Sequence, residues 1–261
     1  MRENSRPVRM LGIGLEIAVP IAILVLWAVL SANSPSFYFP PLVDIFRAFG
    51  DSWLFERVHT DVLPSLERLF GGYVIAVVAA VVIGVALGSS RTLLQMFDPV
   101  VQFMRAIPAP VLLPAGILIL GVGSGMKVAL IAFVCVFPVL LNTIDGVAGV
   151  DPALRETARS FQIPFRERLF RVVLPSASPQ IFAGARVSLS LAVIMMVVSE
   201  MVASSNGIGY FVLQSQRTYA IANMWAGIFL LALLGYVLNV LFLLVERRVL
   251  RWHRGARAGA G

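Results

Sequence analysis

One uninterrupted apolar stretch, Leu69–Gly88, reads LFGGYVIAVVAAVVIGVALG and contains no charged residue. About 20 residues of this kind form a helix long enough to cross the roughly 30 Å hydrocarbon core of a bilayer. Further apolar stretches lie on both sides of it, at about residues 10–30, 99–121, 127–144, 181–203 and 224–245. We therefore predict an all-α integral membrane protein with six transmembrane helices.

The overall composition agrees with this prediction. The 261 residues are 59% hydrophobic and only 13% charged, with a net charge of +7, whereas about a quarter of the residues in an average soluble domain are charged. The positive charge does not indicate a nucleic-acid partner, because that reading needs basic residues on an aqueous face and most of this chain is apolar. The single cysteine, Cys135, excludes an internal disulfide.

The arginines predict the orientation of the chain. They gather in residues 1–12, in the segment 146–178 and in the C-terminal tail, and such clusters favour the cytoplasmic side. We expect both termini in the cytoplasm and an outer, partly helical cap over residues 31–68. The predicted division is a tail at 1–9, one transmembrane domain at 10–248 and a flexible basic tail at 249–261. The first apolar stretch resembles a signal peptide, but its length, Glu16, Pro20 and the lack of a cleavage site favour an uncleaved helix.

The cytoplasmic segment from Val150 reads VDPALRETARSFQIPFRERLFRVVLPSASP. Asp151 followed by Pro152 predicts a helix start, which extends to about Phe161. Pro164 then breaks the helix, and a second short amphipathic helix follows. We expect Pro175 and Pro179 to end this second helix. The segment is either an ordinary solvated loop or a surface on which a cytoplasmic protein docks.

The spacing of residues in this segment favours docking. It resembles the EAA motif of ABC importer permeases, which is Glu-Ala-Ala, three residues, Gly, nine residues, then Ile-x-Leu-Pro. The corresponding residues here are Glu156, Thr157, Ala158, Gln162, Leu174 and Pro175. A left-handed turn at the glycine position would cost glutamine about 1–2 kcal/mol. Either the turn has another shape here or Gln162 tolerates the strain.

Other stretches between about Phe39 and Trp252 are similar to the nitrate/sulfonate/taurine branch of these permeases. They are Phe39-Pro40-Pro41, Phe97-Asp98-Pro99, Arg105-Ala106-Ile107-Pro108, residues 137–143, Val198-Ser199-Glu200-Met201 and residues 205–210. The resemblance implies the type I permease fold in the bacterial inner membrane, with residues 146–178 as a coupling segment. It also implies a transport subunit, not an enzyme, that imports a small solute, for example a sulfonate, nitrate or taurine.

The same resemblance implies the partners. These are a second permease copy, a cytoplasmic ATPase dimer that binds ATP and Mg, and a periplasmic or lipoprotein substrate-binding protein, besides membrane lipid. We expect no cofactor in this chain. The alternatives are a secondary transporter, which needs no ATPase, and a membrane scaffold without transport.

The sequence lacks the residues that a P-loop ATPase, a serine protease or a metalloenzyme needs. A P-loop requires G-x-x-x-x-G-K-[ST], but around Lys127 a methionine replaces the second glycine and Val128 the Ser/Thr. A serine protease needs a histidine near its nucleophile, and the only histidines, His59 and His253, lie outside the apolar stretches. There is no His/Cys/carboxylate cluster for a metal.

Ionisable residues inside apolar stretches invite a functional reading because they are costly in a membrane. Arg105, Arg186 and Glu200 qualify, and Arg186, Ser190 and Glu200 share a helical face. We predict that these four residues line the translocation path. The alternative is that the long side chains extend to the membrane surfaces. The prolines 108, 110, 114 and 138 are expected to bend the third and fourth helices, either as part of a gate or as static kinks.

Overall fold

The computed structural model describes residues 5–32, 37–53 and 57–251, and these residues contain helices and turns but no strand. Two units emerge, of which the larger comprises residues 58–211 and 231–261 and is called the core unit here. The smaller comprises residues 1–57 and 212–230. The all-α prediction is confirmed for the described residues.

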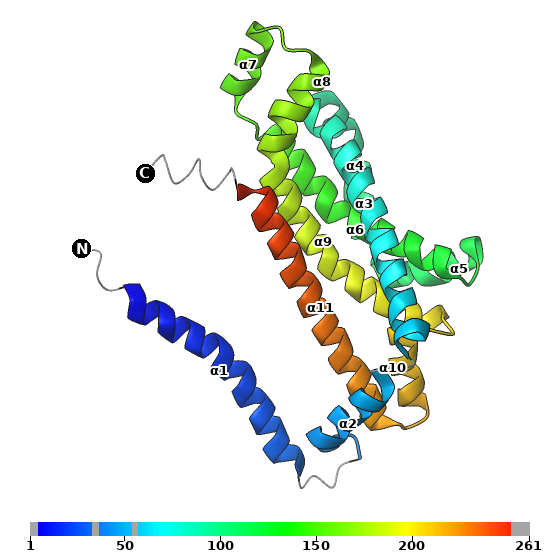
Figure 1. Cartoon of the computed structure of the whole chain (residues 1–261). Helices are drawn as coiled ribbons and strands as arrows, with labels where there is room; N and C mark the ends of the chain where they lie inside the picture. The colour runs from blue at the N-terminus through cyan, green and yellow to red at the C-terminus, as the bar shows by residue number, and fades with distance from the viewer. Residues whose placement is uncertain (1–4, 33–36, 54–56, 252–261) are drawn as a thin grey trace. The chain divides into compact units, whose positions relative to one another are not determined.

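Three long helices form the centre of the core unit. They are α3 (Leu63–Ser89), α6 (Ser124–Ala148) and α9 (Leu174–Ala203), and they lie side by side in Figure 1. Aliphatic side chains of the C-terminal part of α11 (Ile221–Val249) pack against the same core. Each helix contains one of the predicted spans and extends beyond it by a few residues, because polar residues at the ends continue the helix.

Small residues allow α3 and α6 to approach closely. Gly72, Ala76, Ala80 and Gly84 recur at every fourth position of α3 and are all buried. A methyl group at Gly84 would lie 2.7 Å from Cβ of Thr143 on α6. Helices in membranes associate through such small-residue contacts, because no hydrophobic effect drives them together in lipid.

Hydrogen bonds also join the central helices. The Ser188 hydroxyl donates to the Cys135 carbonyl at 2.8 Å, and the Cys135 thiol donates to the Ser188 carbonyl at 3.4 Å. The Tyr73 hydroxyl on α3 donates to the Ala185 carbonyl on α9 at 2.8 Å. These bonds satisfy buried polar atoms that would otherwise be costly.

The prediction of one helix over residues 99–121 is wrong. The chain instead forms α4 (Arg91–Ala106), a 3₁₀ turn (Ala109–Val111) and α5 (Leu112–Leu120), with a bend of 79° at the break. Pro108 has no N–H and disfavours helical backbone at Ile107, which is extended with φ −71° and ψ 119°. The prolines in this region therefore break the helix, whereas the prediction was a bend within one helix.

The smaller unit contains α1 (Ser5–Ala32), α2 (Leu42–Trp53), part of α10 (Ile208–Arg217) and the first turns of α11. Aromatic rings contact one another within it: Phe46 and Phe49 lie 5.4 and 5.7 Å from Phe229, and Trp27 lies 4.9 Å from Trp225, measured between ring centroids. Helix α2 confirms that residues 31–68 are partly helical.

Four described helices are long and apolar enough to cross a membrane, or five if the bent pair counts as one span. The predicted first span coincides with α1, whose apolar portion among the residues searched is Ile21–Ala32, so six spans remain a prediction. Helix α1 begins at Ser5, within the predicted N-terminal tail 1–9, and α11 ends at Val249, one residue beyond the predicted transmembrane domain 10–248. The predicted flexibility of the C-terminal tail concerns residues 252–261, which lie outside the described part.

Candidate functional site

Residues 151–173 form an arm at one end of the core unit (Figure 1). Its first helix is α7 (Pro152–Ser160), and the Asp151 carboxylate caps it by accepting a 2.8 Å hydrogen bond from the Ala153 N–H. Pro152 occupies the first turn, where no N–H is needed. The predicted helix start is confirmed.

Helix α7 ends in a left-handed turn at Gln162, whose φ is 54°. The Ile163 N–H donates to the Ala158 carbonyl at 3.0 Å, and the Gln162 N–H donates to the Arg159 carbonyl at 2.8 Å. This pair of bonds is a Schellman motif, which favours glycine at the left-handed position. The sequence left open either a turn of another shape or a left-handed turn with a strained Gln162. The structure has the left-handed turn, and Gln162 adopts it.

The predicted end of the second short helix at the prolines is wrong. Helix α8 (Phe165–Arg168) passes through a π-helical turn (Leu169–Val173) into α9, so that Phe165–Ala203 forms one helical span of 39 residues. Pro175 lies just after this turn and has no N–H to donate to the preceding turn, but the backbone stays helical through it. Pro179 does leave the Pro175 carbonyl without its usual helix donor, and the Ser178 hydroxyl donates to that carbonyl at 2.7 Å.

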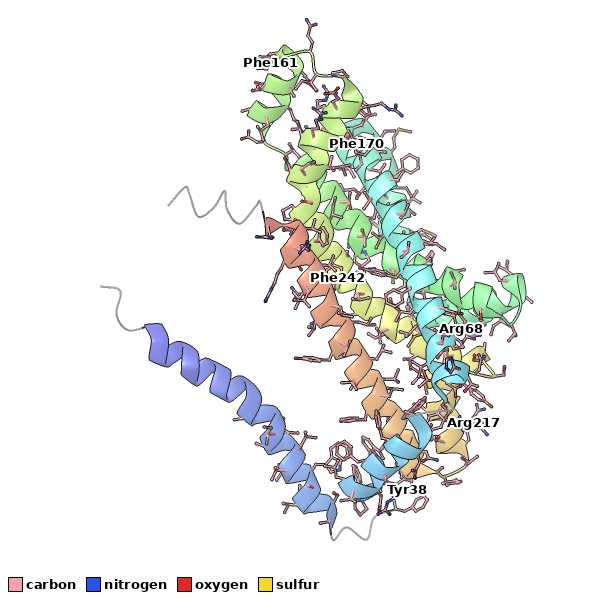
Figure 2. The ribbon with its side chains drawn as sticks, viewed as in Figure 1. Tyr38, Arg68, Phe161, Phe170, Arg217 and Phe242 are labelled. Atoms are coloured by element: carbon pink, nitrogen blue, oxygen red, sulfur yellow. The ribbon has the colours of Figure 1, made fainter. Side chains whose placement is uncertain are left out.

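The arm exposes a mixed surface. Of the six predicted coupling residues, Glu156, Thr157 and Gln162 are exposed, Leu174 and Pro175 are half-buried and Ala158 is buried. The phenylalanines 161, 165 and 170 are 77%, 62% and 66% exposed. Figure 2 shows Phe161 and Phe170 at this end, away from Arg68. Exposed aromatic side chains among charged ones are typical of protein-binding surfaces.

A buried ion pair lies toward the other end of the core unit. Arg68 Nη1 on α3 is 2.8 Å from Glu200 Oε1 on α9, and the two side chains are 7% and 0% exposed. Arg68 also donates through Nε to the Ser124 hydroxyl at 3.0 Å and through Nη2 to Asn206 Oδ1 at 2.6 Å. The Ser65 hydroxyl lies 2.8 and 2.9 Å from the two Glu200 oxygens. We call Ser65, Arg68, Ser124, Glu200 and Asn206 the Arg68–Glu200 cluster.

The loop after α9 encloses the carboxylate of this cluster. The Gly209 N–H donates to Glu200 Oε2 at 3.1 Å, and the Gly207 N–H donates to Asp61 Oδ1 at 2.8 Å. Gly207 has φ 114°, and a Cβ there would lie 2.4 Å from the Glu200 carboxyl carbon. Only glycine fits this position. Hydrogen bonds of the cluster therefore hold residues 204–209 against both α3 and α9.

The predicted path residues do not share one environment. Arg105, Arg186 and Ser190 are exposed in the single chain, whereas Glu200 is fully buried. Within the chain, Glu200 is paired with Arg68 in the interior of the core unit. The role of the four predicted residues in the path stays a prediction.

Sequence reasoning did not find the partner of Glu200. Arg68 borders a predicted span, and an opposite charge within another span was the available signal. Helix α10 and the burial of Lys127, which donates to the Gly123 carbonyl at 3.3 Å, were also not predicted.

Comparison with known proteins assigns the family. Residues 72–251 match the family described as binding-protein-dependent transport system inner membrane component. The chain belongs to this family. It is thus a multi-pass inner-membrane permease, the transport subunit of an ABC importer whose ATPase and substrate-binding protein are separate partners.

Individual relatives agree with the assignment. The permease is 30% identical over 236 residues to a putative aliphatic sulfonates transport permease protein of Bacillus subtilis, covering 90% of this chain and 86% of the relative. It is 28% identical over 250 residues to the taurine transport system permease protein of Escherichia coli, covering 92% and 90%. An inward-facing structure of the MetNI methionine ABC transporter matches with a TM-score of 0.65 at 20% identity, over 72% of this chain and 94% of that one. This last likeness supports the type I permease fold.

Proposed function

We propose that the arm docks on the ATPase subunit and carries its movement into the membrane helices. The observation that supports this most is the unbroken helical path over Phe165–Ala203. A displacement of the arm would reach the buried residues of α9 through continuous helical backbone, with no non-helical linker between them. The Schellman turn holds Ile163, two residues before this path, against the end of α7 through the bond from the Ile163 N–H to the Ala158 carbonyl.

The surface chemistry of the arm supports docking in a groove. Phe161, Phe165 and Phe170 offer apolar anchors, and aromatic and arginine side chains supply much of the binding energy at protein interfaces. In this proposal Glu156, Thr157 and Gln162 face the ATPase, whereas the half-buried Leu174 and Pro175 connect the arm to α9. ATP and Mg are held by the ATPase and not by this chain.

We further propose a transported solute of the small-sulfonate type, delivered by an external binding protein. The sulfonate and taurine permeases are similar over most of the chain. Two copies of the permease would enclose the path. Exposed arginines such as Arg105 and Arg186 provide positive charge for an anion, together with Ser190. Glu200 would act on the path through the loop that it fastens.

The arginine distribution supports cytoplasmic placement of both termini and of the arm. The alternative, a secondary transporter, would use no ATPase and would have no need of the arm.

The test is a charge reversal on the arm, Glu156→Lys. Glu67→Lys is the matched control, because Glu67 is also an exposed glutamate and lies at the end of α3 that is remote from the arm. Copurification with the ATPase and ATP-dependent uptake of a sulfonate into vesicles are measured for both variants. We expect Glu156→Lys to lower both quantities at least tenfold and Glu67→Lys to leave copurification unchanged. Normal copurification and uptake by Glu156→Lys would contradict the docking proposal.

A further inference from the structure

A small cavity of about 110 Å³ lies where the arm meets the end of α3. Three arginines line it, Arg155 and Arg159 from α7 and Arg168 from α8, together with Ser89, the last residue of α3. Leu169, Val173 and the ring of Phe165 complete the wall. The cavity thus combines cationic donors with an apolar side at the end of a membrane-spanning helix.

The three arginines have unused capacity for an anion. None of them forms an ion pair with a carboxylate within the described residues. Arg155 donates through Nη2 to the Val147 carbonyl, but its Nε is buried and has no hydrogen-bond partner. Arg168 lies over the ring of Phe165, with 5.8 Å between its guanidinium carbon and the ring centroid, and this contact uses none of its N–H donors.

Such an arrangement is unfavourable without a counter-charge. A buried donor without a partner costs free energy, and three guanidinium groups around one cavity repel one another. Guanidinium groups match the oxygens of a phosphate through paired hydrogen bonds. Basic pockets beside membrane helices at the bilayer surface bind phospholipid headgroups by this chemistry.

We infer that this cavity is a binding site for a phosphate group, held by Arg155, Arg159 and Arg168. The apolar wall and the position at the end of α3 favour the headgroup of an anionic phospholipid as its source over a soluble phosphate. A bound phosphate would join α7, α8 and the end of α3, and so stiffen the base of the arm. This site stands whether or not an ATPase docks on the outer surface of the arm.

The test is a binding titration with the purified full chain in detergent. The probes are phosphatidylglycerol, phosphatidylcholine and inorganic phosphate, and native mass spectrometry counts the bound lipid. The variants are Arg159→Gln and Arg168→Gln. Arg166→Gln is the matched control, because it removes the same charge from an exposed arm residue that does not line the cavity.

We expect each cavity variant to weaken phosphatidylglycerol binding about fivefold, the control to leave it unchanged and phosphatidylcholine to bind weakly throughout. Resistance of bound phosphatidylglycerol to 10 mM inorganic phosphate identifies the lipid as the source. Binding of inorganic phosphate with the same dependence on Arg159 identifies a soluble phosphate. The inference is overturned if Arg166→Gln weakens phosphatidylglycerol binding as much as the cavity variants do, or if the binding of neither phosphatidylglycerol nor inorganic phosphate depends on Arg159.

Discussion

Replacement of Arg68 by alanine tests whether the Arg68–Glu200 cluster holds the core unit together. The substitution removes the guanidinium and leaves the Glu200 carboxylate, which is 0% exposed, with only the Ser65 hydroxyl and the Gly209 N–H as donors. Removal of one partner from a buried ion pair costs about 3–5 kcal/mol, because an uncompensated charge stays buried. For a chain of this size each kcal/mol lowers the midpoint of thermal unfolding by about 2–4 °C. We therefore expect a fall of roughly 6–20 °C.

The chain supplies its own reporter for this measurement. Cys135 is the only cysteine and is 0% exposed, so a thiol-reactive fluorescent dye labels it only when the core opens. Thermal unfolding of the purified permease in detergent is followed with this dye. Arg166→Ala, which removes an exposed arginine from the arm, is the control and should change the free energy of unfolding by less than about 0.5 kcal/mol.

The double variant Arg68→Ala/Glu200→Gln separates loss of the ion pair from general damage. It removes both charges, so the unpaired carboxylate is no longer present and only neutral hydrogen bonds worth about 1 kcal/mol each are affected. We expect it to be more stable than Arg68→Ala alone. The reasoning is refuted if Arg68→Ala unfolds at the same temperature as Arg166→Ala. It is also refuted if the losses of stability in the single variants Arg68→Ala and Glu200→Gln add up to the loss in the double variant.

Two further substitutions test the turn of the arm and the helix contact. Gln162→Gly relieves a left-handed conformation that costs about 1 kcal/mol, so hydrogen exchange at the Ile163 amide should slow. Gln162→Val should accelerate this exchange. Equal exchange in both variants would count against the strained turn. Gly84→Val places a side chain where Cβ alone would lie 2.7 Å from Thr143, and overpacking of this kind costs about 1–3 kcal/mol. Gly235→Val is its control, because nothing lies within 4 Å of a Cβ at Gly235, and equal thermal stability of the two variants would contradict the close α3–α6 contact.

Local sequence signals predicted the helices well. Apolar stretches of span length located α3, α6, α9 and α11, and the Asp151-Pro152 pair located the start of α7, because these features depend on residues near one another in the chain. The prolines predicted a bend within one helix but not the break at Pro108, since a proline indicates a weak point and neighbouring packing sets the angle. The π-helical turn at Leu169–Val173 has no sequence signature of this kind, so the end of the second arm helix was misplaced.

The same distinction between residues near and far in the sequence applies to the candidate site. The arm is a contiguous segment, and its spacing was visible in the sequence. The Arg68–Glu200 pair joins residues 132 positions apart, and no periodicity connects them. Glu200 stood out as an ionisable residue in an apolar stretch, but its partner could be found only when the packing of α3 against α9 was known.

The central claim, that the arm contacts the ATPase, is tested most directly by cross-linking from one introduced cysteine. Ser160→Cys provides an exposed thiol at the end of α7 while Cys135 stays buried. We predict that it cross-links to the ATPase in membrane vesicles and that ATP changes the yield, whereas Gln216→Cys, an exposed position on α10, does not cross-link. Copurification of the ATPase without a cross-link from Ser160→Cys, or with one from Gln216→Cys instead, would contradict the account.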